Sequence, residues 1–107
     1  MSQPNVYKTV QLTATGSTQN LLAALQAVDS SILAAYREVN LQGDPGNSSF
    51  EVFIGDDQTS PTRYGVALSN GQSRNYRESG FAAGVPVANM YFLASGGSPK
   101  LNVELVN

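Results

Sequence analysis

The sequence contains no cysteine and no histidine. Without cysteine the chain can form no disulfide, no thiolate nucleophile and no sulfur-ligated metal site. Without histidine it lacks the commonest general base and the commonest metal ligand, which excludes a Ser-His-Asp triad and a zinc finger. We therefore expect a protein that is not an enzyme and that carries no metal and no cofactor.

Charged residues and long apolar runs are also scarce. Only 13% of the 107 residues are charged and the net charge is −2, whereas Ser, Thr, Asn and Gln supply 34 residues. A slightly acidic chain is not the usual composition of a nucleic-acid reader, so we expect no nucleic-acid partner. No apolar run approaches 18 residues, and Met1 opens no positively charged and apolar leader, so we expect neither a membrane span nor a signal peptide.

One segment has the periodicity of a helix. Leu21, Leu25, Val28 and Ile32 follow one another at spacings of four, three and four residues. Ser17 or Thr18 could cap the first turn, because their hydroxyls accept backbone N–H bonds there. Since the sequence 29–31 is a poor helix interior, the pattern predicts one short helix near residues 18–28.

The rest of the chain alternates with period two, which is typical of half-buried strands. Turn signals separate the runs, and Asn70-Gly71 indicates a hairpin between residues 64–68 and 73–77. The predicted strands cover residues 6–14, 36–42, 50–54, 64–68, 73–77, 89–93 and 101–106. The segment 89–93 is apolar on both sides, so it should be buried on both faces.

This spacing of short strands favours a mainly β fold, a single antiparallel β-sandwich or jelly-roll-like barrel. With 107 residues, of which 41% are apolar, the chain has enough material for one domain and one core. We expect that domain to span residues 1–107, with a short mobile arm at its N-terminus.

Arginine and tyrosine side chains are concentrated in one part of the sequence. The residues in question are Arg63, Tyr64, Arg74, Tyr76 and Arg77. Both residue types are enriched where proteins bind one another. We predict a protein-binding surface here, with the alternative that these are solvated hairpin residues without a partner.

The N-terminal strand provides a further candidate contact, because an exposed strand can add to a sheet edge of its own or of a neighbouring chain. Tyr7 lies at the start of that strand. We therefore add Tyr7 to the predicted protein-binding residues.

Three acidic residues, Asp44, Asp56 and Asp57, form the only candidate metal constellation. Loop carboxylates and carbonyl oxygens can bind Ca²⁺, which takes six to eight oxygen ligands. Their spacing matches no known calcium loop, and Asp is a common turn residue. We therefore predict that they form turns and that the chain has no metal site.

From residue 36 onward the order of motifs resembles a known class of proteins. The segments 37–42, 52–56, 62–68, 70–73, 87–93 and 101–106 read as a strand, an Ile-Gly-Asp, a Gly-Val-Ala-Leu, an Asn-Gly-Gln-Ser, an apolar strand and a terminal strand. This order is similar to that of small β-sandwich virion proteins encoded by tailed bacteriophages and prophages. The resemblance covers about two thirds of the chain, and residues 21–28 have no counterpart in it.

The resemblance implies a structural role in the virion, which is assembled in the host cytoplasm. It implies a capsid decoration or cement protein that binds the major capsid protein or other virion proteins, as a homo-oligomer and specifically a trimer. One alternative is a small subunit of the neck, tail or fibre. The other is a carbohydrate- or receptor-binding β-sandwich, which Tyr64 and Tyr76 near amides and Asp would favour and the absence of Trp disfavours.

Overall fold

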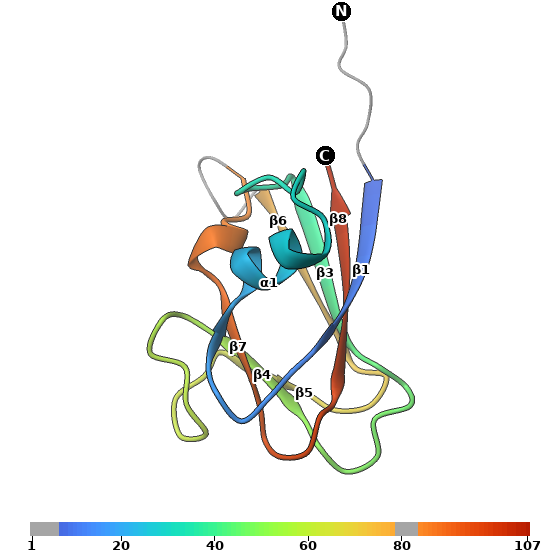
Figure 1. Cartoon of the computed structure of the whole chain (residues 1–107), viewed down its shortest axis with the longest axis vertical. Helices are drawn as coiled ribbons and strands as arrows, with labels where there is room; N and C mark the ends of the chain where they lie inside the picture. The colour runs from blue at the N-terminus through green and yellow to red at the C-terminus, as the bar shows by residue number, and fades with distance from the viewer. Residues whose placement is uncertain (1–6, 79–83) are drawn as a thin grey trace, which may run out of the picture.

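The chain forms two antiparallel sheets of four strands each in a computed structural model, which describes residues 7–78 and 84–107 (Figure 1). The first sheet has the order β1 (Tyr7–Thr13), β8 (Lys100–Val106), β3 (Glu38–Gly43) and β6 (Ser73–Arg77). The second has the order β2 (Gln19–Asn20), β7 (Tyr91–Ala94), β4 (Val52–Gly55) and β5 (Val66–Leu68). This confirms the predicted mainly β fold with two packed antiparallel sheets.

Strict alternation of side chains decides which face of the first sheet is buried. In the central strand β8, Leu101, Val103 and Leu105 are buried, while Asn102 and Glu104 between them are partly exposed. Successive side chains of a strand point to opposite faces, so one face joins the core and the other meets solvent. The core is one cluster drawn from both sheets and from the helix.

The second sheet is covered on both faces around β7. Phe92 and Ala94 belong to the core, and Leu93 between them is only 3% exposed on the opposite face. Beside it on β4, Phe53 is buried under the ring of Tyr64, with ring centroids 4.3 Å apart. The prediction that this strand is buried on both faces is therefore confirmed.

The helix α1 (Leu21–Val28) begins later than predicted. Its N-cap is Asn20, whose side chain accepts the backbone N–H of Ala23, and neither Ser17 nor Thr18 caps it. The reason is that residues 19–20 pair with β7 as the short strand β2 before the helix starts. Within the predicted apolar stripe, Leu21 and Leu25 are buried, whereas Val28 is 64% exposed.

The predicted hairpin of residues 64–68 with 73–77 is wrong, although both strands exist. β5 pairs with β4 in the second sheet, whereas β6 pairs with β3 in the first. The turn between them crosses from one sheet to the other. It passes so close to Gly43 that no side chain would fit at that position. The backbone N–H of Gly43 donates to the Gln72 carbonyl, and the Gly43 carbonyl accepts the N–H of Gly71, so both groups of Gly43 hold this turn.

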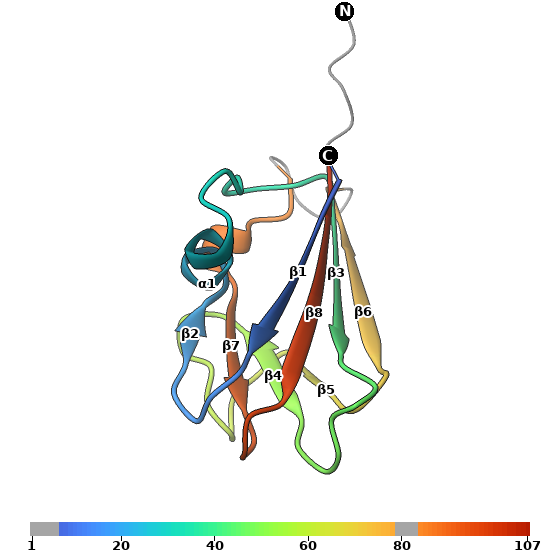
Figure 2. The same cartoon turned by 45° about the vertical axis from the view of Figure 1, so that its right-hand side comes forward.

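A helical layer completes the second sheet, whose strands are short. α1 and the 3₁₀ helix η2 (Val87–Asn89) lie beside each other near the end of the sandwich where the C-terminus emerges (Figures 1 and 2). Leu21, Leu25 and Val87 are buried there. The predicted N-terminal arm lies outside the described residues.

Candidate binding face

The outward face of the first sheet carries mostly amides and hydroxyls. We call it the polar face and define it by residues of the four strands β1, β8, β3 and β6 that point away from the core: Thr9, Gln11, Glu38, Asn40, Gln42, Ser73, Asn75, Asn102 and Glu104. Tyr7 and Arg77 lie at its two ends, in the row that also contains Glu38 and Val106. The face therefore spans the whole width of the sheet.

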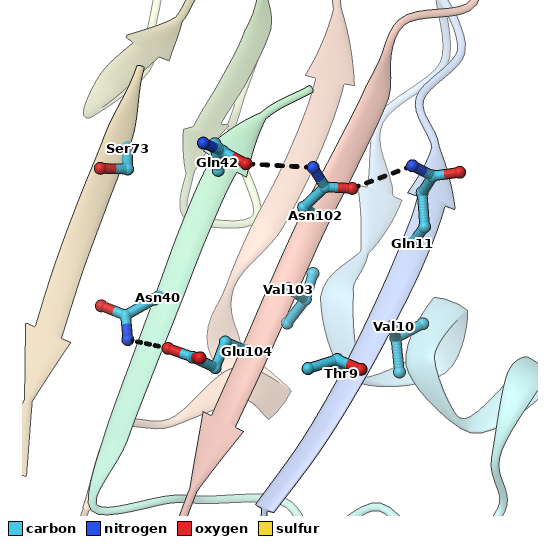
Figure 3. A pocket seen from close by; sticks show the side chains of 9 residues that line it. All are labelled: Thr9, Val10, Gln11, Asn40, Gln42, Ser73, Asn102, Val103 and Glu104. Atoms are coloured by element: carbon cyan, nitrogen blue, oxygen red, sulfur yellow. Dashed lines mark hydrogen bonds between the residues drawn. The ribbon is translucent and has the colours of Figure 1, made fainter. Parts of the chain in front are cut away.

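One row of amides links three strands of this face. Gln11 donates to the Asn102 Oδ1 atom over 3.0 Å, and Asn102 donates to the Gln42 Oε1 atom over 3.1 Å (Figure 3). The strand register places these side chains directly opposite one another. Asn102 also donates to Asp44 over 3.0 Å, so its amide is held from both sides.

The next row is centred on the carboxylate of Glu104. It accepts hydrogen bonds from the Tyr7 hydroxyl over 2.6 Å and from the Asn40 amide over 2.5 Å. These bonds lower the pKa of Glu104, with the Tyr7 bond the larger cause. The same bond raises the pKa of Tyr7. Glu104 is therefore held as a carboxylate near the centre of the face.

The carboxylate of Asp44, at the margin of the face, is also held by hydrogen bonds. The Asn102 amide, and then the backbone N–H of Gly46, lower the pKa of Asp44 by hydrogen bonding to its oxygens. The network thus joins residues from β1, β3 and β8 to the turn after β3. Its amides are ordered before any partner binds.

A shallow hollow of about 470 Å³ lies over these rows, lined by side chains from all four strands. Amide donors and acceptors in fixed positions can bind the backbone and polar side chains of a partner protein. Removing an amide from water costs less than removing an ion, whose loss of hydration costs several kcal/mol. This arrangement suits binding, and most of its groups are uncharged.

The six predicted binding residues do not form one surface. Tyr7 is 61% exposed at one end of the polar face, and Arg77 lies at the other end. Arg74 and Tyr76, also on β6, point toward the inner side of that sheet, with the guanidinium 5.4 Å from the ring centroid.

The remaining two predicted residues lie on the second sheet and the loop before it. The ring of Tyr64 stacks on Phe53, and Arg63 lies 3.5 Å from Asp56 in an exposed ion pair. Asp56, the partner of Arg63, lines the same hollow as Arg74 and Tyr76, whereas Tyr7 and Arg77 lie on the polar face. The predicted residues are close in sequence, but β5 and β6 belong to different sheets.

Sequence reasoning missed the amides at the centre of the polar face. Gln11, Asn40, Gln42 and Asn102 are the outward members of strands that the sequence predicted. The alternation of each strand could have identified these amides, because they occupy its polar positions. What the sequence lacked was the register that brings β8 between β1 and β3.

The acidic residues form turns, as predicted. Asp44 accepts the N–H of Gly46 over 2.8 Å, and Asp56 accepts the N–H of Gln58 over 2.9 Å. Within residues 7–78 and 84–107, no three His, Cys, Asp or Glu side chains are grouped so that they could hold a metal ion. The helices of the described part of the chain include none that is long and apolar enough to span a membrane.

Comparison with known proteins gives no match: no family model fits the sequence, and no curated protein or solved structure is significantly similar to it.

Proposed function

We propose that this chain is a non-enzymatic structural protein of a tailed-phage virion, a decoration or cement subunit that binds the assembled capsid shell. Two things support the proposal. The motif order after residue 36 resembles that of small β-sandwich virion proteins, and the polar face offers a broad surface for another protein. The polar face is the observation that carries it.

The energetics of the polar face suit attachment to a repetitive protein surface. Its amides are already tied to one another, so they lose little side-chain freedom on binding. Each new hydrogen bond contributes about 0.5–1.5 kcal/mol net. Such a surface binds weakly as a single copy, and several linked copies bind far more tightly because later contacts are intramolecular.

An oligomer is therefore part of the proposal. The virion class that the sequence resembles implies a trimer, and the chain would join the particle during assembly in the host cytoplasm. A trimer could present three polar faces to a site where capsid subunits meet. The partner is then the major capsid protein, with no role for nucleic acid or for a membrane.

The test compares one substitution on and off the polar face. Gln11→Arg places a bulky cation in the amide row, and Gln58→Arg makes the same change in the exposed loop after β4. Each variant is co-expressed with the major capsid protein of a tailed phage, and the amount that sediments with expanded shells is measured. We expect Gln11→Arg to reduce binding at least tenfold and Gln58→Arg to bind as the unaltered chain does.

Three results would discriminate between outcomes. An unaltered chain that stays monomeric, and that changes neither shell binding nor the heat stability of shells, contradicts the proposal. Binding that Gln11→Arg leaves intact shows that the shell contacts another surface. Sedimentation with tails or necks would change the location within the virion and retain the structural role.

A further inference from the structure

The side of the sandwich bordered by β6 and β5 contains an unfilled hollow. β6 is the last strand of the first sheet and β5 the last strand of the second. Between them lies a hollow of about 310 Å³ with mainly apolar walls, which include Ile54, Val66, Tyr76, Pro86 and Met90, and with one acid and one cation at its margin, Asp56 and Arg74. Ile54 and Met90 belong to the core, so the hollow reaches the core from outside.

The backbone of β6 has groups available for another strand. The backbone N–H of Glu78 donates to the Arg37 carbonyl, and the N–H of Gly43 donates to the Gln72 carbonyl. These bonds show that the backbone groups of Gln72 and Glu78, and of every second residue between them, face β3. In an antiparallel pair these residues alternate with residues whose N–H and C=O point away. Those of Ser73, Asn75 and Arg77 therefore point outward, and no backbone group in the described residues bonds to them.

The strand β6 itself carries two cations, Arg74 and Arg77, and its five residues include no acid. The nearest acids come from other elements: Asp56 lines the hollow, and Glu38 lies opposite Arg77 on β3. Among the described residues the ion pairs are Lys8–Asp29, Arg37–Glu78 and Arg63–Asp56, so neither of the two β6 arginines has a carboxylate partner there. Arg74 lies over the Tyr76 ring at the margin of the hollow.

We propose that β6 accepts an extended acidic segment of a partner protein as a fifth strand of the first sheet, with an apolar side chain of that segment seated in the hollow. Alternate side chains of an added strand point to opposite faces of the sheet. The inward ones meet the hollow and the outward ones lie beside Arg77. An apolar residue flanked on both sides by acidic residues satisfies both requirements.

Charge argues against a second copy of this chain as the occupant. Two paired β6 edges would place four arginines and no acid of β6 in one short strand pair, which offers no charge complementarity. An acidic segment instead places its outward carboxylates beside Arg77, while its apolar side chains face the hollow near Arg74. The side chains of Ser73 and Asn75 belong to the polar face, but strand addition uses their backbone groups, whereas capsid binding is tested at Gln11 on the opposite edge of the sheet. Gln11→Arg and Ser73→Pro therefore allow either proposal to fail alone.

The probe is the blocked seven-residue peptide EVELEVE, which places Val and Leu on one face and Glu on the other. The comparison peptide KVKLKVK has the same apolar face with the opposite charge. We expect EVELEVE to bind at least tenfold more tightly in calorimetry. Equal affinity of the two peptides would overturn the proposal.

Amide hydrogen exchange gives a readout on the unaltered chain. The N–H groups of Arg74 and Tyr76 already bond β3 and should exchange slowly with or without peptide. Those of Ser73, Asn75 and Arg77 should become protected only when EVELEVE binds. Protection without this alternation, or protection confined to β1, would contradict strand addition at β6.

Substitutions then locate the site. Ser73→Pro removes an outward N–H at the first residue of β6, where proline is tolerated, and should weaken EVELEVE binding at least fivefold. Thr13→Pro makes the same change at the free edge of β1 and should leave it unchanged. Arg77→Glu should weaken EVELEVE and strengthen KVKLKVK. Equal loss from the two proline variants, or self-association of the chain that Ser73→Pro abolishes, would overturn the assignment.

Discussion

The two sides of the sandwich differ in how they are closed. On the side of β1, the Lys8 ammonium reaches across to Asp29 and Ser31 over 2.7 and 2.9 Å, and the helix α1 buries Leu25 completely nearby. On the side of β6, a hollow remains, and Arg74 at its margin has no carboxylate partner in the described residues.

Both sides begin from the same kind of edge strand, so backbone hydrogen bonding does not distinguish them. The difference is made by side chains that arrive from elsewhere in the chain. A partner at β1 would have to displace native contacts, whereas a partner at β6 would fill the hollow and lie beside Arg77, which has no ion pair within residues 7–78 and 84–107. We therefore expect substitutions in the contacts beside β1 to cost more stability than substitutions at the wall of the hollow beside β6.

The largest expected effect is a loss of helix packing. Leu25→Ala removes a completely buried side chain and should lower the free energy of unfolding by about 2–5 kcal/mol. Val66→Ala, at the half-buried wall of the hollow, should cost about 1 kcal/mol or less. Urea unfolding measures both, and equal losses would remove the distinction between the two sides.

The hollow can be tested by adding a methyl group. Val66→Ile places one carbon into available space and should raise the free energy of unfolding by up to about 0.8 kcal/mol. Val85→Ile adds the same carbon at a completely buried position and should lower it by about 1–3 kcal/mol. If Val66→Ile also destabilises the chain, the hollow is smaller in solution than in this structure.

Acid should lower the free energy of unfolding by weakening the contacts beside β1. Hydrogen bonds from Lys8, and then from Ser31, hold the pKa of Asp29 well below its ordinary value of 3.8. The folded chain then binds fewer protons than the unfolded one, so stability is fully present above pH 3.8 and declines as pH falls toward the folded pKa. Glu104 and Asp44 act in the same direction.

Urea midpoints measured from pH 6 to pH 2 test this dependence. Asp29→Asn should make the decline shallower, because that position no longer titrates. A stability that rises in acid would contradict the assigned bonds.

The smallest expected effect is the loss of one ion pair. Lys8→Met keeps an unbranched side chain and removes the charge that bonds Asp29 over 2.7 Å. Arg37→Met removes a more exposed pair, Arg37–Glu78, at 3.4 Å. We expect a measurable fall in Tm for the first and none for the second, since exposed pairs contribute little. A reversed order would show that β1 is closed by packing alone.

Much of the secondary structure could be predicted because its signals are local. The strand over residues 73–77 has its predicted bounds, and the alternation in residues 101–106 correctly assigned the buried and outward side chains of β8. The helix start was misjudged because Thr18 and Asn20 are both good capping residues. Only the pairing of β2 with β7 decides between them.

The candidate site could be predicted only in part, because it depends on strand pairing. Arg74 and Arg77 are three residues apart on β6, yet one points toward the hollow and the other lies at the end of the polar face. Asn102 and Gln11 are far apart in sequence but lie opposite each other in the register of β8 and β1. No local pattern distinguishes these arrangements from a hairpin of β5 with β6.

The amino-acid sequence by itself determined a β-rich chain with little charge and none of the reactive side chains of cysteine or histidine. It also determined which side of each strand is polar, because alternation is a property of neighbouring residues. The tertiary structure decided which strands are neighbours, which polar sides join into one face and which side of the sandwich stays unfilled. Those outcomes depend on the free energy of contacts between distant segments, which no window of the sequence contains.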